Sequence, residues 1–305
     1  MQLQAAKNIT INLFNESLRT SHSRFMTLAA LVSACYLPSW IGFLLDSVWH
    51  GQSYTVLNFG AIAVGIKVFV QNRKALAAVE VQEDDRFLGY TLTILGMIVL
   101  ALLRGFNQPL TFQYLSAMMI FLGMIWSTWG IFIFQKFPFT LFLVLLGLYP
   151  NLFFIAMQTC KFLTPDEFLE RIMAWAGSQG LNLMGYQSVA KAAYVILPQG
   201  SIVIWPACSG FEMMFILSGV SVLVAQFMKL SWKKGLALIA FGWSMAALMN
   251  VPRIMLLAIA IIFWGKPTFD FWHGPIGGQI FSCFLFTLYY YGVEAIMKYK
   301  KSATS

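Results

Sequence analysis

Three chemically competent side chains stand at the ends of three consecutive apolar segments. Cys208 lies in Trp205-Pro206-Ala207-Cys208-Ser209-Gly210, Arg253 in Asn250-Val251-Pro252-Arg253, and His273 in Trp272-His273-Gly274. A thiol beside an imidazole can attack a carbonyl and form a thioester. A guanidinium is always charged and donates in a fork, so it can stabilise an oxyanion or hold a carboxylate. Together these residue types predict cysteine-dependent acyl transfer.

The residues around Cys208 favour a reactive thiol. Pro206 indicates that a helix begins at the cysteine, where free amides and the helix dipole lower a thiol pKa. Ser209 and Gly210 are small, so a substrate backbone can approach, and their amides are candidate oxyanion donors. The alternative is an inert packing thiol, the usual role of cysteine in an apolar segment.

Arg253 needs a partner or water, because a charge inside a long apolar segment is costly. Pro252 interrupts the helical hydrogen bonds beside it, which a cavity or a neighbouring helix can compensate. We expect Asn250, on the same face, to hold the guanidinium. Glu212 lies four residues after Cys208 and is expected to pair with Arg253 or a loop group. Snorkelling of Arg253 toward the headgroups is the alternative.

His273 follows Asp270 by three residues, and we expect Asp270 to orient the imidazole ring. A solvated role is the alternative, and it is the default for His22 and His50. Small residues spaced four apart allow helices to pack closely. Two such stripes are Gly242-Ala246-Asn250 and Gly274-Gly278-Ser282.

The composition is that of a membrane protein. Of the 305 residues, 59% are hydrophobic and 10% charged, whereas soluble domains carry about 25% charged residues. Apolar segments long enough to cross about 30 Å of hydrocarbon recur along the chain. The sequence predicts an all-α polytopic fold with about eight transmembrane helices, at 25–45, 54–71, 87–103, 110–134, 139–158, 208–228, 235–263 and 275–297.

The basic residues predict the topology. The net charge of +8 fits cytoplasmic loops that contact anionic lipid rather than nucleic acid. With Arg253 set aside, most basic residues fall on the side of the N-terminus, so both termini are expected in the cytoplasm. Cys208, Arg253 and His273 then share the extracytoplasmic side. The outer side holds Arg104, Lys161, Arg171, Lys191 and Lys266.

One long outer loop, 159–207, separates five N-terminal spans (1–158) from a three-span core (208–297) within a single membrane domain, 1–305. Thr164-Pro165-Asp166-Glu167 resembles a capping box and predicts an interfacial amphipathic helix that ends at Gly177 and Gly180. Pro198-Gln199-Gly200 predicts the turn of a short β-hairpin leading to Cys208.

The four cysteines show neither a CxxC pair nor metal-ligand spacing, and no cofactor or metal is expected. Cys35 and Cys283 lie inside apolar segments and are interpreted as packing residues. A disulfide between Cys160 and Cys208 is a less favoured alternative to two free thiols.

Ala207-Cys208-Ser209-Gly210, Asn250-Val251-Pro252-Arg253-Ile254 and His273-Gly274 resemble the signature blocks of the exosortase/archaeosortase family. The resemblance covers residues 200–297, and the chain length is similar to that of cyanobacterial-type exosortases. It implies a transpeptidase or protease of the bacterial plasma membrane that acts on exported proteins. Its substrates would carry a C-terminal sorting signal (PEP-CTERM): a Pro-Glu-Pro-like motif, a transmembrane helix and a basic tail.

By position, the resemblance makes Cys208 the nucleophile, His273 the acid/base and Arg253 the stabilising cation. The acceptor of the cleaved chain is unknown. Two other functions stay open from the residues alone. One is a transporter that binds an anion or a proton at Arg253 and Glu212, and the other is a non-catalytic assembly protein.

Overall fold

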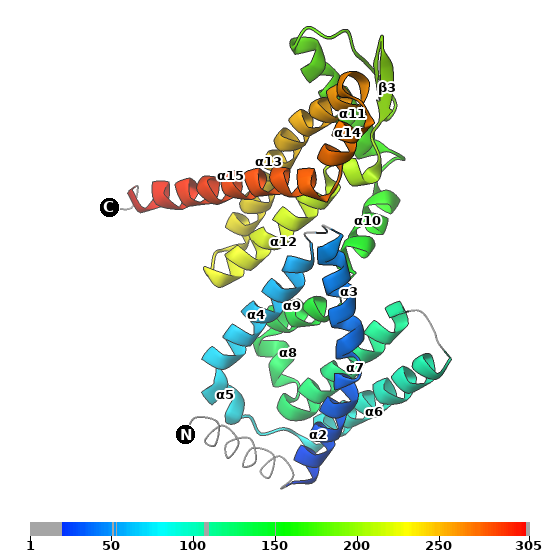
Figure 1. The fold of residues 1–305 in the computed structure, drawn as a ribbon. Helices are drawn as coiled ribbons and strands as arrows, with labels where there is room; N and C mark the ends of the chain where they lie inside the picture. The colour runs from blue at the N-terminus through cyan, green and yellow to red at the C-terminus, as the bar shows by residue number, and fades with distance from the viewer. Residues whose placement is uncertain (1–19, 51, 53, 107–109, 150, 303–305) are drawn as a thin grey trace, which may run out of the picture. The chain divides into compact units, whose positions relative to one another are not determined.

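The structure of the protein is a computed structural model that describes residues 20–50, 52, 54–106, 110–149 and 151–302. The chain folds into two compact units (Figure 1). The first comprises the described residues of Met1–Asp46 and Asn58–Pro150, and the second those of Ser47–Leu57 and Asn151–Ser305.

The first half of the chain is built from helices. Glycines on α6 and α7 let these two helices approach closely: a Cβ added at Gly89 would lie 2.6 Å from the Ser127 Cβ. Asn58 is buried and donates to the Gly147 and Tyr149 carbonyls, at 3.0 and 2.9 Å. The helices are α2 (Ser21–Ala34), α3 (Leu37–Trp49), α4 (Thr55–Gln71), α5 (Arg73–Ala77), α6 (Glu83–Gly105), α7 (Leu110–Trp129), α8 (Phe132–Lys136) and α9 (Pro138–Leu148).

The second unit packs α12, α13 and α15 around a shared apolar cluster. On α13, a Cβ added at Gly242 would lie 3.0 Å from the Leu217 Cβ and 3.4 Å from the Tyr289 ring, and Ala246 and Asn250 are fully buried. The predicted packing stripe on this helix is therefore confirmed. The elements are α10 (Leu152–Leu163), α11 (Phe168–Leu183), β1 (Val189–Lys191), β2 (Tyr194–Leu197), β3 (Gly200–Val203), η1 (Pro206–Cys208), α12 (Phe211–Phe227), α13 (Trp232–Ile259), η2 (Ala260–Trp264), α14 (Lys266–His273) and α15 (Pro275–Ser302).

The three strands form an antiparallel sheet in the order β1-β2-β3. Side chains alternate between the two faces of a strand, and here the faces differ in burial. Val195 and Leu197, together with Ile204 just after β3, are buried in one apolar cluster with residues of α11 and α13. This packing anchors the segment that leads to Cys208.

Within the described residues, four helices are long and apolar enough to cross a membrane. They are Ser21–Trp49, Glu83–Gly105, Trp232–Trp264 and Pro275–Ala295, and α9 with α10 supplies a fifth if that bent pair counts as one span. The architecture is that of a helical membrane protein. The eight spans remain a prediction, since α4 and α12 are apolar but only 17 residues long.

The predicted start and end of α11 are both wrong. Thr164 does not cap this helix, because its hydroxyl donates to the Cys160 carbonyl in the last turn of α10 (2.7 Å), and α11 begins at Phe168. Gly177 and Gly180 lie inside the helix. A Cβ at Gly177 would come within 2.7 Å of Ile254 on α13, so this glycine permits close packing instead of ending the helix.

Candidate active site

Cys208 is reached from β3 through an extended residue and a tight turn. Trp205 has extended backbone angles, and Pro206 opens the 3-10 turn Pro206–Cys208. The Cys208 amide donates to the Trp205 carbonyl (2.8 Å). The prediction that Cys208 begins a helix is wrong, because α12 starts at Phe211. Cys208 therefore precedes α12 instead of forming its first turn.

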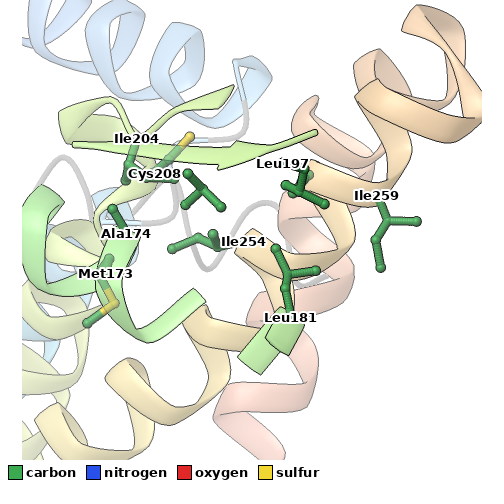
Figure 2. Close-up of a cluster of buried hydrophobic side chains, with 10 residues drawn as sticks. Met173, Ala174, Leu181, Leu197, Ile204, Cys208, Ile254 and Ile259 are labelled. Carbon is green, nitrogen blue, oxygen red and sulfur yellow. The ribbon is translucent and has the colours of Figure 1, made fainter. Parts of the chain in front are cut away.

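The Cys208 side chain is 6% exposed and belongs to the apolar cluster of the sheet, α11 and α13. Figure 2 shows it beside Ile204. Its backbone is tied to α13, since the Asn250 Nδ2 donates to the Cys208 carbonyl at 2.9 Å. Asn250 was expected to hold the Arg253 guanidinium; its amide donates instead to the backbone of the candidate nucleophile.

Gly210 meets two steric demands at once. Its φ of 82° lies in the left-handed region that other residues rarely adopt. A Cβ at this position would also lie 3.1 Å from Asn250 Nδ2. Glycine therefore lets the chain turn into α12 while Asn250 stays on the Cys208 carbonyl.

His273 is the thiol's polar partner. Its Nε2 lies 3.2 Å from the Cys208 Sγ, within hydrogen-bonding reach of a sulfur atom. The ring stacks on Phe269, with centroids 5.0 Å apart and an interplanar angle of 14°. Asp270, expected to orient the ring, forms an ion pair with Lys266 at 2.7 Å instead. Phe269, one turn earlier on α14, is the ring's stacking partner.

Arg253 lies on α13 just after Pro252, and the helix continues through the proline to Ile259. Arg253 and Glu212 line the same cavity as Cys208 and His273. The Arg253 Nε is buried and has no hydrogen-bond partner among the described residues. An orphaned buried donor of this kind marks a place where a ligand or water acceptor is needed.

Burial controls the charge of the thiol and the imidazole. It raises the pKa of the Cys208 thiol, and the nearby Arg253 charge offsets only part of this rise. Burial also lowers the pKa of His273, and Arg253 lowers it further, while Asp270 opposes the change. Both shifts favour the neutral forms of the pair. The expectation of a lowered thiol pKa is wrong because burial outweighs the neighbouring positive charge.

The cavity has a volume of about 410 Å³. Its lining also includes His50 and Gln52, which come from the chain between α3 and α4. Sequence reasoning assigned His50 only a solvated role. The available signal was the predicted topology, which puts the loop at His50 on the same side as Cys208.

The small stripe at the start of α15 borders this cavity. Gly274, Gly278 and Ser282 all line it, and a Cβ added at Gly278 would meet nothing within 4 Å. The predicted close helix packing at Gly278 is therefore wrong. At this position the small residue leaves open space beside Cys208 and His273.

Ser209 is engaged inside its own turn. Its amide and its hydroxyl both donate to the Pro206 carbonyl, at 3.3 and 2.8 Å. The Ser209 amide is thus already used, contrary to its expected role as an oxyanion donor. The Gly210 amide, by contrast, makes no hydrogen bond to the backbone of the described residues.

All four cysteines are free thiols, so Cys160 and Cys208 are not bridged. Within the part of the chain that the structure describes, no three His, Cys, Asp or Glu side chains form a group that could hold a metal ion.

A family model described as transmembrane exosortase (Exosortase_EpsH) matches residues 48–290. The chain belongs to the exosortase family. The match spans the cavity residues from His50 to Ser282, including Cys208, Arg253 and His273. No curated protein and no solved structure matches the chain. As a transmembrane exosortase, the protein is a multi-pass membrane protein with an exosortase-type function in processing the sorting signals of exported proteins.

Proposed function

We propose that this exosortase is a cysteine transpeptidase or protease that cleaves C-terminal sorting signals through a thioester on Cys208. The observation that carries the proposal is the 3.2 Å approach of the Cys208 Sγ to the His273 Nε2, beside Arg253 in one cavity. A thiol, a base and a fixed cation converge there, as acyl transfer requires.

The first half-reaction makes the acyl-enzyme. The His273 Nε2 accepts the thiol proton as the Cys208 Sγ attacks the scissile carbonyl, and the carbonyl electrons move to oxygen. Arg253 and the Gly210 amide stabilise this oxyanion. The C–N bond then breaks, the leaving amine takes the proton from His273, and a thioester remains on Cys208.

The second half-reaction reverses the proton path. His273 accepts a proton from an amine acceptor or from water as it attacks the thioester carbonyl. The C–S bond breaks and the proton returns to the Cys208 sulfur. An amine acceptor gives transpeptidation and water gives hydrolysis.

The substrates of this proposal are exported proteins with a Pro-Glu-Pro-like motif, a transmembrane helix and a basic tail. The topology is the one that the basic residues predict: eight spans in the bacterial plasma membrane, both termini cytoplasmic, the site outside. The substrate helix would lie against α12, α13 and α15 within the bilayer.

The test is coexpression with a tagged reporter that ends in such a signal. Wild type should shorten the reporter, and Cys208→Ala should leave it intact at the same membrane abundance. Removal of the signal by the alanine variant would refute the mechanism. A transporter or an assembly protein predicts no cleavage by either form. Hyper-reactivity of the thiol is not a useful discriminator, because burial raises its pKa.

A further inference from the structure

β3 has an open edge. Within the described residues its one strand neighbour is β2. The Ile204 amide donates to the Ala193 carbonyl at 2.8 Å, and Ile202 pairs with Val195. Backbone groups of successive residues point to opposite edges of a strand. Ser201 and Val203 therefore direct their N–H and C=O groups away from β2, and they make no backbone hydrogen bond with another described segment.

A cavity lies beside the face of β2 and β3 that points away from the buried apolar cluster. It has a volume of about 740 Å³, and Tyr194, Val203 and Trp205 form part of its wall. Trp205 is 64% exposed and Tyr194 49%. Most of the remaining lining comes from the end of α10, the start of α11 and the residues between them, and its charged members are Lys161, Asp166, Glu167, Glu170 and Arg171. The cavity offers apolar, aromatic and charged contacts to side chains that lie over this face.

The open edge leads directly to the candidate nucleophile. Strand pairing ends at Ile204, and only Trp205 and the turn Pro206–Cys208 separate it from the thiol. A polypeptide that extends the sheet along β3 would be guided toward Cys208. An exposed strand edge binds extended main chain through regular hydrogen bonds, while alternate side chains contact the pockets beside it.

We infer that the outer edge of β3 binds the extended substrate segment just upstream of the scissile bond, as a fourth, parallel strand. The inference rests on the proposed function, and it adds how the substrate is aligned. The direction follows from the chain path: β3 runs toward Cys208, and the upstream segment must end there. Alternate side chains of this segment would lie over the cavity beside Tyr194, Val203 and Trp205.

Disulfide trapping tests the inference with the full-length chain. Cys35, Cys160, Cys208 and Cys283 are replaced by alanine, Ser201→Cys is introduced, and the tagged reporter carries single cysteines at successive upstream positions. Neighbouring strands bring same-face side chains to about 5 Å. Ser201→Cys should therefore crosslink chiefly to one reporter position, and the two positions that flank it, whose side chains point to the other face, should not react. With Val203→Cys the crosslinked position should lie two residues closer to the scissile bond.

Val189→Cys is the matched control. Val189, Ile196 and Ser201 form one cross-strand row, so Val189 shares the face but lies three strand spacings, about 14 Å, from the added strand. It should not crosslink. Equal trapping by Val189→Cys, equal crosslinking at adjacent reporter positions, or a shift away from the scissile bond would overturn the inference.

A functional comparison separates this inference from the proposed mechanism. Val203→Pro removes an outward N–H without breaking a bond to β2, and edge positions tolerate proline. It should cleave the reporter at least about fivefold more slowly than Val203→Ala, since one hydrogen bond contributes about 1 kcal/mol. Equal rates, with Cys208→Ala inactive, would overturn only the strand pairing. Cleavage by Cys208→Ala would overturn the mechanism instead.

Discussion

The Nδ2 of Asn250 donates to the carbonyl of Cys208 at 2.9 Å. This bond joins α13, which carries Arg253, to the turn that presents the thiol to His273. Asn250 is fully buried, and this bond is a buried side-chain contact to the backbone of the turn. Asn250 is therefore a positioning residue for the nucleophile in the proposed mechanism.

Replacing Asn250 by alanine should slow reporter cleavage by roughly 10- to 100-fold, because an unsatisfied buried carbonyl costs about 1–3 kcal/mol and the turn loses its anchor. The turnover number, measured per folded enzyme, should fall more than KM rises. Asn250→Leu should not restore activity, since an apolar side chain of similar size cannot donate.

Asn58→Ala is the matched control for this variant. Asn58 is an equally buried asparagine that donates to two carbonyls in the first unit. Its loss should lower thermal stability but leave the turnover of the folded fraction near that of wild type. Equal losses of turnover in the two variants would show that Asn250 has no special role at the site.

Arg253→Lys should reduce cleavage about 100-fold, within the range seen when an oxyanion donor is lost. Lysine keeps the charge but not the planar fork. Arg104→Lys is a suitable control, because Arg104 is exposed in the first unit and donates to Ser39. A fully active Arg253→Lys variant would mean that charge alone is sufficient there.

The pH dependence follows from the directions of the two pKa shifts. Burial lowers the pKa of His273, and the neutral ring is the form that accepts the thiol proton. Cleavage should therefore be lost as the pH falls through a midpoint below about 6.5, the ordinary value for histidine. A pH series with purified enzyme and reporter measures it, and a midpoint above neutrality would contradict this assignment.

The pH dependence of Cys208 alkylation by iodoacetamide gives an independent measure of the thiol pKa. Because burial raises its pKa, the labelling rate should still be rising above pH 8.5, the approximate pKa of a free cysteine. A plateau that already begins below pH 6 would indicate a thiolate–imidazolium pair at rest.

Gly210→Ala should lower cleavage as well. The left-handed conformation costs a non-glycine residue about 1–2 kcal/mol, and the new methyl group would crowd Asn250 Nδ2 at 3.1 Å. Gly185→Ala is a useful control. Gly185 also has a left-handed φ, of 90°, but a Cβ there meets nothing within 4 Å. Similar turnover defects in both variants would argue for a general backbone effect.

Cys208, Arg253 and His273 were selected from the sequence because polar residues at the ends of apolar segments are costly and therefore conspicuous. The structure places all three at one cavity, and their catalytic roles stay a prediction. The sequence also predicted the packing stripe through Gly242 and Ala246, since small residues at helical spacing let helices pack closely, whereas the same spacing at Gly278 leaves open space instead. Both kinds of signal, a polar residue at the end of an apolar segment and small residues at helical spacing, can be recognised within one segment of the chain.

The features that sequence reasoning missed depend on contacts between segments. Burial around Cys208 reverses the expected pKa shift, and this requires knowing that the sheet packs on α11 and α13. Asn250 could reach either Arg253 or another segment, and spacing alone favoured the wrong partner. His50 enters the cavity from a distant loop, which no local pattern indicates.

In the proposed mechanism the sulfur of Cys208 carries the acyl group. The most direct measurement is peptide mapping by mass spectrometry of enzyme quenched in acid during turnover of the reporter. We expect an adduct on the Cys208 peptide that ends at the new substrate C-terminus, is released by hydroxylamine, and is missing from Cys208→Ala. Cleavage of the reporter by Cys208→Ala, or an adduct on a different residue, would contradict the mechanism.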